Sequence, residues 1–347
     1  MNVVRVIRAG LCTTVQDLGR RDMREFGVPV AGAMDLLSHE LANRLVGNSA
    51  TAATLEMTLT GDELEWPNGG LIAVTGAEMS PTISVGDSSE IRLPMNRPVV
   101  IPAGARIRFH AARRGCRCYL AVAGGFDVPL VMGSRSTYLR AHVGGLSGRC
   151  LQPGDVLPLG AVQNDSDFNL PPGQLLDSPP WFVRPLNLPL SSIANLRVLR
   201  GSHFSDLTPE AQSEFWKTPF QISHQSDRMG YRLSGTPLKT ESEFDRLSEG
   251  TTIGTLQLPP DGGPILLMAD SAPTGGYRRI AHVIAADLPN AAQLRPGQTV
   301  LFSETSLSEA QQLAREQRDD LKRALIMAGL SPAIRTVGRQ TLPAVAH

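Results

Sequence analysis

The sequence has few cysteines, no surplus of charge and no long apolar run, and each absence excludes a class of protein. The 33 basic and 33 acidic residues cancel, which argues against nucleic acid or an anionic membrane as the partner. No run approaches the roughly 18 apolar residues that cross a bilayer, and the N-terminus lacks the apolar core of a signal peptide. We therefore predict a cytoplasmic protein.

The cysteine pattern gives no metal or disulfide framework. The four cysteines, Cys12, Cys116, Cys118 and Cys150, follow no zinc-binding spacing. Cytosolic proteins keep their thiols reduced, so we interpret all four as reduced core thiols, with a redox or metal role as the minor alternative. The seven histidines contain no pair at metal-ligand spacing, and we predict no metal site.

Several catalytic signatures are also missing. The sequence contains no GxxxxGK[ST], no GxGxxG after a strand, no HExxH and no GxSxG, which excludes the P-loop, dinucleotide-binding, metalloprotease and hydrolase-elbow motifs. Asp, Arg, Tyr, Thr and Gly residues remain in loops between strands. Such a set suits a site that binds a small polar anion and polarises a carbonyl or amide group.

Glycine and proline are abundant, with 33 and 26 residues, and turn signals recur every eight to twelve residues between short apolar runs, a pattern typical of a sandwich or barrel. We predict a mainly β fold with short embedded helices. Residues 1–163 form an N-terminal β subdomain, 164–192 a linker, 193–305 a C-terminal β subdomain and 306–330 an amphipathic helix. Asp35, Thr208 and Ser306 are the predicted N-caps of three helices.

The stretch from Ser226 to Tyr277 is the strongest candidate site. Its two apolar runs, Thr252–Leu258 and Pro264–Ala269, flank a Pro-Pro-Asp-Gly-Gly turn and predict a β-hairpin. The second strand leads to Asp270 and a glycine-rich loop, whose backbone N–H groups favour an anion. A glycine-rich barrel corner with an exposed aspartate is the alternative.

The residue types suggest roles. Asp227 and Asp270 are candidate bases or N–H acceptors, and Tyr277 is a candidate donor to a developing oxyanion. Arg228 and Arg135 are candidates to hold a carboxylate, carboxybiotin or a phosphate, because a guanidinium binds such groups through two donors. The polar segments around Asp17 and around Arg135 are either ligand loops or solvated connections.

Three blocks of the sequence together resemble one family. They are TTVQDLGRRDMREFGVPVAGAMD with the following AN-x-LVGN and LE, then AGGFDVPLVMGSRSTYLRAHVGGLSGR, then SDRMGYRLSG with SEGTTIGTLQLPPDGGPILLMAD and TGGY. The blocks occur in family order across residues 3–303. The chain resembles the biotin-dependent carboxyltransferase family, also called allophanate hydrolase subunit 2, which includes the C subunit of 5-oxoprolinase.

The resemblance implies two cyclophilin-like β-barrel subdomains and an enzyme subunit that needs partners. The implied reaction is ATP-dependent opening of 5-oxo-L-proline to L-glutamate, with ATP as co-substrate and with the A and B subunits of 5-oxoprolinase as partners (the B subunit is similar to allophanate hydrolase subunit 1). One alternative is a carboxyltransferase component that moves a carboxyl group from carboxybiotin to urea or another small amide. The other is a non-catalytic regulator that sequesters its subunit 1 partner.

The resemblance also implies a set of site residues. Those expected to be catalytic are Asp270, Asp227 and Tyr277. Those expected to bind substrate are Arg228, Arg135, Ser136, Gln16, Asp17, Arg20, Asp35, Asn43, Tyr231, Thr274, Gly275 and Gly276. The family usually reads Asp-x-Gln-Thr-Thr-Gly-Gly-Tyr-Pro after the hairpin, whereas this chain has Ala272 for the Gln and Pro273 for the first Thr. The loop has therefore lost an amide and a hydroxyl group.

Overall fold

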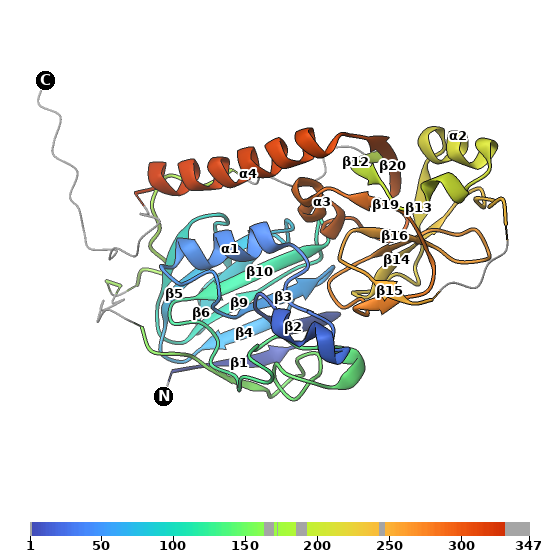
Figure 1. The fold of residues 1–347 in the computed structure, drawn as a ribbon. Coiled ribbons are helices and arrows are strands. Elements are labelled where there is room, and N and C mark those ends of the chain that lie inside the picture. Colours follow the sequence, from blue (N-terminus) through green and yellow to red (C-terminus); the bar gives the residue numbers. More distant parts are fainter. Residues whose placement is uncertain (1, 163–169, 172, 185–192, 243–246, 330–347) are drawn as a thin grey trace, which may run out of the picture.

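The fold consists of two β subdomains joined side by side and bridged by a long C-terminal helix (Figure 1). The structure is a computed structural model, and it describes residues 2–162, 170–171, 173–184, 193–242 and 247–329. The mainly β class predicted from the sequence is confirmed.

The N-terminal subdomain is built from two sheets that enclose one apolar core. In β1, Val4 and Val6 point into this core and Arg5 points to solvent, as the alternation in the sequence requires. The first sheet contains β11 (Val156–Pro158), β1 (Val3–Arg8), β4 (Glu63–Trp66), β9 (Ala105–Arg108), β6 (Thr82–Val85) and β7 (Ile91–Arg92) in spatial order. The second contains β2 (Cys12–Gln16), β3 (Thr54–Thr58), β10 (Arg117–Val122), β5 (Gly70–Gly76) and β8 (Pro98–Ile101).

The C-terminal subdomain closes into a barrel of seven strands around a second core rich in phenylalanine. Phe215 and Phe302 stack at a centroid distance of 5.1 Å inside it. The barrel order is β12 (Ile193–Arg200), β19 (Arg278–Val283), β16 (Thr255–Leu258), β17 (Ile265–Leu267), β14 (Gly230–Ser234), β13 (Phe220–Ile222) and β20 (Thr299–Glu304). A separate pair, β15 (Glu249–Gly250) and β18 (Thr274–Gly275), lies at its edge.

The hairpin predicted from the sequence is confirmed with shorter strands. β16 and β17 pair antiparallel, with Leu256 opposite Leu266. The residues that precede Thr255 lie outside the strand. Asp270 does follow the second strand, but its side chain is buried, so the exposed aspartate of the alternative interpretation is wrong.

The predicted helix caps are confirmed. Asp35 accepts from the Ser38 N–H at the start of α1 (Leu36–Leu45), Thr208 from the Ala211 N–H at the start of α2 (Pro209–Lys217), and Ser306 from the Glu309 N–H at the start of α4 (Leu307–Met327). The remaining helical elements are α3 (Leu288–Ala292) and the 3₁₀ turns η1 (Arg21–Phe26), η2 (Leu139–Ala141), η3 (Phe204–Asp206) and η4 (Ala285–Asp287).

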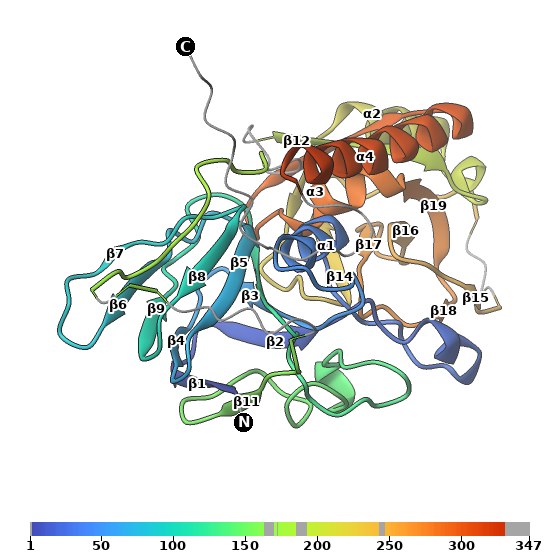
Figure 2. The ribbon, with the colours of Figure 1, turned by 90° about the vertical axis from the view of Figure 1, so that its left-hand side faces the viewer.

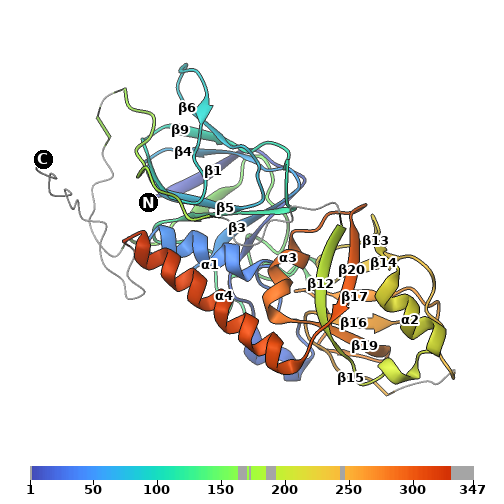
Figure 3. The same ribbon diagram turned by 90° about the horizontal axis from the view of Figure 1, so that it is seen from above.

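Helix α4 spans both subdomains (Figure 3). Near its start Ala310 packs on Ile284 and Ala286 of the C-terminal subdomain, and near its end Leu321 and Leu325 pack in a cluster with α1. The helix therefore acts as a brace over the domain joint. No helix within the described ranges is long and apolar enough to cross a membrane.

Part of the predicted linker packs on the N-terminal subdomain. Asp177 forms a bridge with Val100, and Val183 is buried in the cluster beneath α1 and α4. Residues 164–169, 172 and 185–192 of the predicted linker lie outside the described residues. The predicted domain boundaries remain a prediction.

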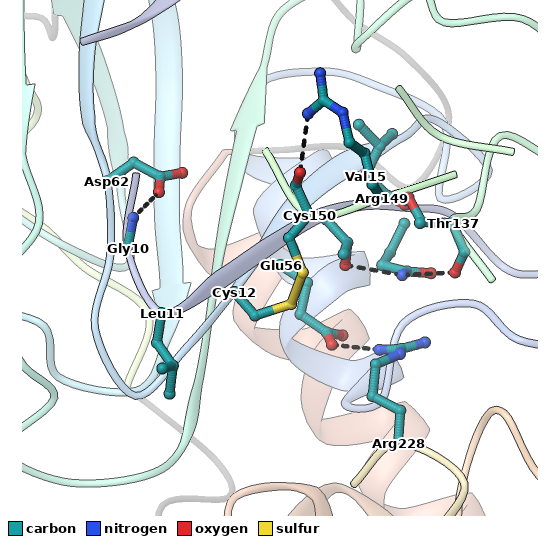
Figure 4. The surroundings of a disulfide bond; sticks show 12 residues. Gly10, Leu11, Cys12, Val15, Glu56, Asp62, Thr137, Arg149, Cys150 and Arg228 are labelled. Carbon is teal, nitrogen blue, oxygen red and sulfur yellow. Dashed lines mark hydrogen bonds and ion pairs between the residues drawn. A yellow bond between two sulfur atoms is a disulfide. The ribbon is translucent and has the colours of Figure 1, made fainter. Parts of the chain in front are cut away.

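The interpretation of all four cysteines as reduced thiols is wrong for two of them. Cys12 and Cys150 form a disulfide with a Cα–Cα separation of 5.4 Å (Figure 4). The two residues are 138 positions apart, so their proximity depends on the tertiary fold and leaves no spacing signal in the sequence. The disulfide joins the start of β2 to the segment that precedes β11. Cys116 and Cys118 are buried and free, as predicted.

Candidate functional site

The two subdomains meet through a network of buried charges. Arg228, from the C-terminal subdomain, donates two hydrogen bonds to Asp270, at 3.0 and 2.9 Å, and others to Glu56 and to the Gly32 carbonyl of the N-terminal subdomain. Arg117, from the N-terminal subdomain, donates to the Tyr231 hydroxyl at 2.7 Å in the C-terminal subdomain. Each arginine therefore crosses the joint.

Glu56 lies at the centre of this network. It accepts from Arg228, from the Tyr119 hydroxyl at 2.7 Å and from the Met34 N–H at 2.9 Å. Burial opposes its ionisation, but the guanidinium groups of Arg228 and Arg117 hold the pKa of Glu56 below its usual value. A carboxylate with such partners stays charged. Its contact with Arg228 holds the two subdomains together.

The pKa of Asp270 is shifted in the opposite direction to that of Glu56. Burial raises its pKa above the usual value, although Arg228 acts in the opposite direction, and the nearby carboxylates of Glu56 and Asp227 add to the rise. A raised pKa suits a general base. Both carboxylate oxygens accept from Arg228, so Asp270 helps to position the arginine that crosses the joint.

A second joint contact centres on Gln293, at the end of α3. Its side-chain amide donates to Asp35 at 2.7 Å and to the Arg117 carbonyl at 2.9 Å, and its carbonyl oxygen accepts from the N–H groups of Cys116 and Arg117. Asp35 is thus held by its own helix, through Ser38, and by the other subdomain. Gln293, Glu56, Arg117 and Tyr119 were not predicted as site residues.

Asp17 clamps the loop that carries Arg135. Its carboxylate accepts from the hydroxyls of Ser134 and Ser136, both at 2.6 Å, and from the Arg135 N–H at 2.6 Å. Burial opposes ionisation of Asp17, but these hydrogen bonds, with one from Gly19, hold its pKa below the usual value. Arg20 donates to the carbonyls of Val131 and Ser136 in the same loop.

The side chains of the remaining predicted residues point in several directions. Arg135 pairs with Asp127 at 2.7 Å, Gln16 donates to the Thr137 carbonyl, and Asn43 donates to the Ala52 carbonyl. Asp227 is exposed and accepts from the N–H groups two and three residues ahead. The loop residues Thr274, Gly275, Gly276 and Tyr277 lie at the surface, with Tyr277 48% exposed.

A cavity of about 350 Å³ lies between the subdomains beside these groups. From the N-terminal side it is lined by the η1 turn and by the residues before α1; in Figure 2 η1 lies next to β18 of the C-terminal subdomain. The lining residues are Leu18, Arg21, Arg24, Val30, Ala31, Ala33, Leu36, Thr251, Thr252, Ile253, Met268, Ala269, Ser271, Ala272 and Pro273. None of the fifteen residues predicted for the site is among them.

The N-terminal wall depends on two glycines. Gly19 and Gly32 have φ values of +81° and +87°, and a Cβ on Gly32 would lie 2.9 Å from the Gly19 nitrogen. Segments 17–20 and 30–33 therefore run in close contact, with the Arg20 N–H donating to Val30 and the Ala33 N–H donating to Asp17. This close approach explains Gly19 and Gly32 of the first sequence block and presents η1 to the cavity.

The C-terminal wall is held by Thr251. Its hydroxyl donates to the Ala272 carbonyl at 2.6 Å and its N–H donates to the Pro273 carbonyl at 2.9 Å, while its own carbonyl accepts from Arg24 of η1. Thr251 thus links both walls. Ala272 and Pro273, the two departures from the family pattern, line the cavity directly.

The described residues of the site form no arrangement for a metal ion. No group of three or more His, Cys, Asp or Glu side chains in the described part of the chain is placed to hold a metal ion. The arrangement offers instead two guanidinium groups and three hydroxyl groups in an apolar chamber, with a buried carboxylate, Asp270, between two of its lining residues.

Comparisons with known proteins agree with this architecture. The chain is 41% identical over 320 residues to the C subunit of 5-oxoprolinase from Escherichia coli (strain K12), covering 91% of this chain and 96% of that protein. It is 31% identical to the urea amidolyase of Lachancea kluyveri, over 90% of this chain and 17% of that protein. The crystal structure of the Kluyveromyces lactis urea carboxylase superposes with a TM-score of 0.82 at 28% identity, covering 99% of this chain and 32% of that one. Residues 26–304 match the family described as carboxyltransferase domain, subdomain A and B, and the chain belongs to this family.

Proposed function

We propose that this chain is a subunit of an ATP-dependent 5-oxoprolinase, which converts 5-oxo-L-proline, ATP and water into L-glutamate, ADP and phosphate. The observation that carries this proposal is the 41% identity to the C subunit of a 5-oxoprolinase across 96% of that protein. The urea amidolyase of L. kluyveri, by contrast, is matched over only 17% of its length. A relative that is matched along nearly its whole length is the better guide to the function of the whole chain.

The site supports this substrate. 5-Oxo-L-proline is a small anion with a compact ring, and the cavity combines apolar walls with Arg21 and Arg24. Opening the lactam requires water to attack the ring carbonyl and the ring nitrogen to leave as an amine. Of the proposed catalytic residues, Asp227 is exposed, Asp270 is buried beside the cavity, and Tyr277 lies at the surface. Asp270 as base and Tyr277 as donor to the oxyanion remain proposals.

The reaction calls for partners. We propose that proteins equivalent to the A and B subunits of 5-oxoprolinase assemble with this chain in the cytoplasm and that the chain is inactive alone. ATP enters as co-substrate, and no residue of this chain is assigned to it, because the sequence lacks the P-loop pattern. Biotin belongs only to the alternative function below.

The proposal is tested by measuring glutamate released from 5-oxo-L-proline, with ATP, by the purified chain and by its mixture with A and B subunits from the same organism. We expect release only from the full mixture and only with ATP. If three folded and associated subunits release no glutamate, the proposal is wrong.

A carboxyltransferase component is the second candidate, and one observation favours it. The urea carboxylase structure of K. lactis covers 99% of this chain with a TM-score of 0.82, so the scaffold is compatible with carboxyl transfer to an amide. Loss of carboxybiotin in the presence of the chain and urea would support this candidate, and its persistence alongside glutamate release would exclude it.

A further inference from the structure

The cavity between the subdomains has a one-sided charge. Arg21 and Arg24 line it, and among the described residues on its walls there is no acidic side chain. The other polar groups on the walls are the hydroxyls of Thr251, Thr252 and Ser271. Arginine side chains with no acid on the same wall favour an anionic ligand, because a guanidinium binds an oxyanion with two parallel hydrogen bonds.

The walls distinguish a carboxylate from a phosphate. Phosphate cradles are commonly built from backbone N–H groups of glycine-rich loops, and no glycine occurs among the residues described as lining this cavity. Most of the wall is aliphatic, with Leu18, Val30 and Met268 among its larger members. A volume of about 350 Å³ is near the lower end for ligand sites, which favours a compact ligand.

We propose that this cavity binds a small monocarboxylate with a compact ring, whose carboxylate lies against Arg21 and Arg24. The ring packs against the aliphatic wall, and Ala272 with Pro273 sets the limit of its size. The binding site follows from the cavity itself, and only the identification of the natural ligand as 5-oxo-L-proline rests on the proposed function.

The two arginines differ in what holds them. Arg24 donates to the Thr251 carbonyl across the joint, so its position depends on both walls and its replacement also removes a contact between subdomains. Arg21 is exposed at the start of η1. Arg21→Met is therefore the cleaner test, because it removes charge and leaves most of the aliphatic length.

Isothermal titration calorimetry on the full chain tests the proposal, with cyclopentanecarboxylate and 5-oxo-L-proline as carboxylate probes and 5-oxo-L-prolinamide as the neutral probe. We expect the carboxylates to bind at least about tenfold more tightly than the amide. We expect Arg21→Met to weaken carboxylate binding at least about tenfold. Arg92→Met is the matched control, because Arg92 is exposed on β7, far from β18 in Figure 2, and we expect it to bind as the wild type does.

Two results would overturn the proposal: equal binding of amide and carboxylate, or unchanged carboxylate affinity in both Arg21→Met and Arg24→Met. Binding of ATP that Arg21→Met weakens while carboxylate binding persists would make the cavity a phosphate site and would also overturn it. The proposed function can fail separately from the proposed site. If cyclopentanecarboxylate binding depends on Arg21 but the assembled subunits release no glutamate, the binding site is supported and the proposed reaction is wrong. If glutamate is released but carboxylate binding depends on neither arginine, the proposed reaction is supported and the binding site is wrong.

Discussion

The domain joint contains two charged regions of opposite character. In the buried network Glu56, Arg117 and Arg228 have charged or hydrogen-bonding partners across the joint, and Asp270 pairs with Arg228 within the C-terminal subdomain. In the cavity Arg21 and Arg24 share the wall with no acidic residue of the described chain. A charge that the protein itself neutralises holds the fold, whereas a charge left for solvent is available to a ligand.

The largest expected effect comes from breaking the network. Arg228→Met leaves Glu56 and Asp270 buried without their shared guanidinium, and removing one partner of a buried pair costs about 3–5 kcal/mol. We expect the free energy of unfolding, measured by urea denaturation, to fall by this amount, while Arg92→Met changes it by less than about 0.5 kcal/mol. A small loss in Arg228→Met would mean that the joint does not depend on its ion pairs.

The Cys12–Cys150 disulfide gives a reference that involves no charged group, although Glu56 and Arg228 lie in its surroundings (Figure 4). Its loop is long, since the cysteines are 138 residues apart, and closing such a loop restricts the unfolded chain. Replacing both cysteines by serine should therefore lower the free energy of unfolding by about 3–4 kcal/mol. Adding a dithiol reductant to the wild type should lower its free energy of unfolding by the same amount. A double-serine variant that is as stable as the oxidised wild type would contradict the prediction.

Asp62 sharpens the comparison, because it is a buried carboxylate without the two arginines that serve Glu56. Burial raises the pKa of Asp62 to about 6, against a hydrogen bond from the Gly10 N–H. Since the folded protein binds this proton more tightly than the unfolded chain does, the charged side chain destabilises the fold above pH 6, and the cost is relieved as the pH falls from about 7 towards 4.

The wild type should accordingly gain on the order of 2–3 kcal/mol from this group between pH 8 and pH 4. Asp62→Asn should lose that contribution, so the difference in unfolding free energy between variant and wild type should shift in favour of the wild type at low pH. Urea denaturation at several pH values measures it, and parallel profiles for the two proteins would contradict the assignment.

The smallest effect on stability is expected on the cavity wall. Ala272 is exposed, so Ala272→Gln should change the free energy of unfolding by less than about 0.5 kcal/mol. It should nevertheless change the affinity for 5-oxo-L-proline, because the new amide enters the cavity. A stable variant with unchanged affinity for the substrate would show that position 272 does not contact the ligand.

The fold was largely predictable, because it rests on local signals. Alternating strands, the Pro-Pro-Asp-Gly-Gly turn and the caps Asp35, Thr208 and Ser306 each depend on a few neighbouring residues. The Cys12–Cys150 disulfide was not predictable, since only the tertiary fold brings these residues together.

None of the residues predicted for the site lines the cavity, although Arg20 and Asp270 are sequence neighbours of lining residues. Reasoning from residue type selected the most polar residues, and Asp17, Asp35, Arg228 and Asp270 are indeed polar because they hold the joint and its loops. The cavity wall is mostly aliphatic, and such residues look like core in a sequence. Arg21 and Arg24 were the available signal, since they lie on a short turn with exposed neighbours, next to the selected Arg20.

Arg21 and Arg24 of the cavity are proposed to bind the carboxylate of 5-oxo-L-proline in an ATP-dependent 5-oxoprolinase. The most direct test is the steady-state kinetics of the assembled enzyme containing wild-type, Arg21→Met or Arg92→Met chains, with glutamate release as the signal. We predict a KM for 5-oxo-L-proline raised at least about tenfold in Arg21→Met, with the KM for ATP unchanged and Arg92→Met equal to wild type. An Arg21→Met enzyme with wild-type KM for 5-oxo-L-proline would contradict the account.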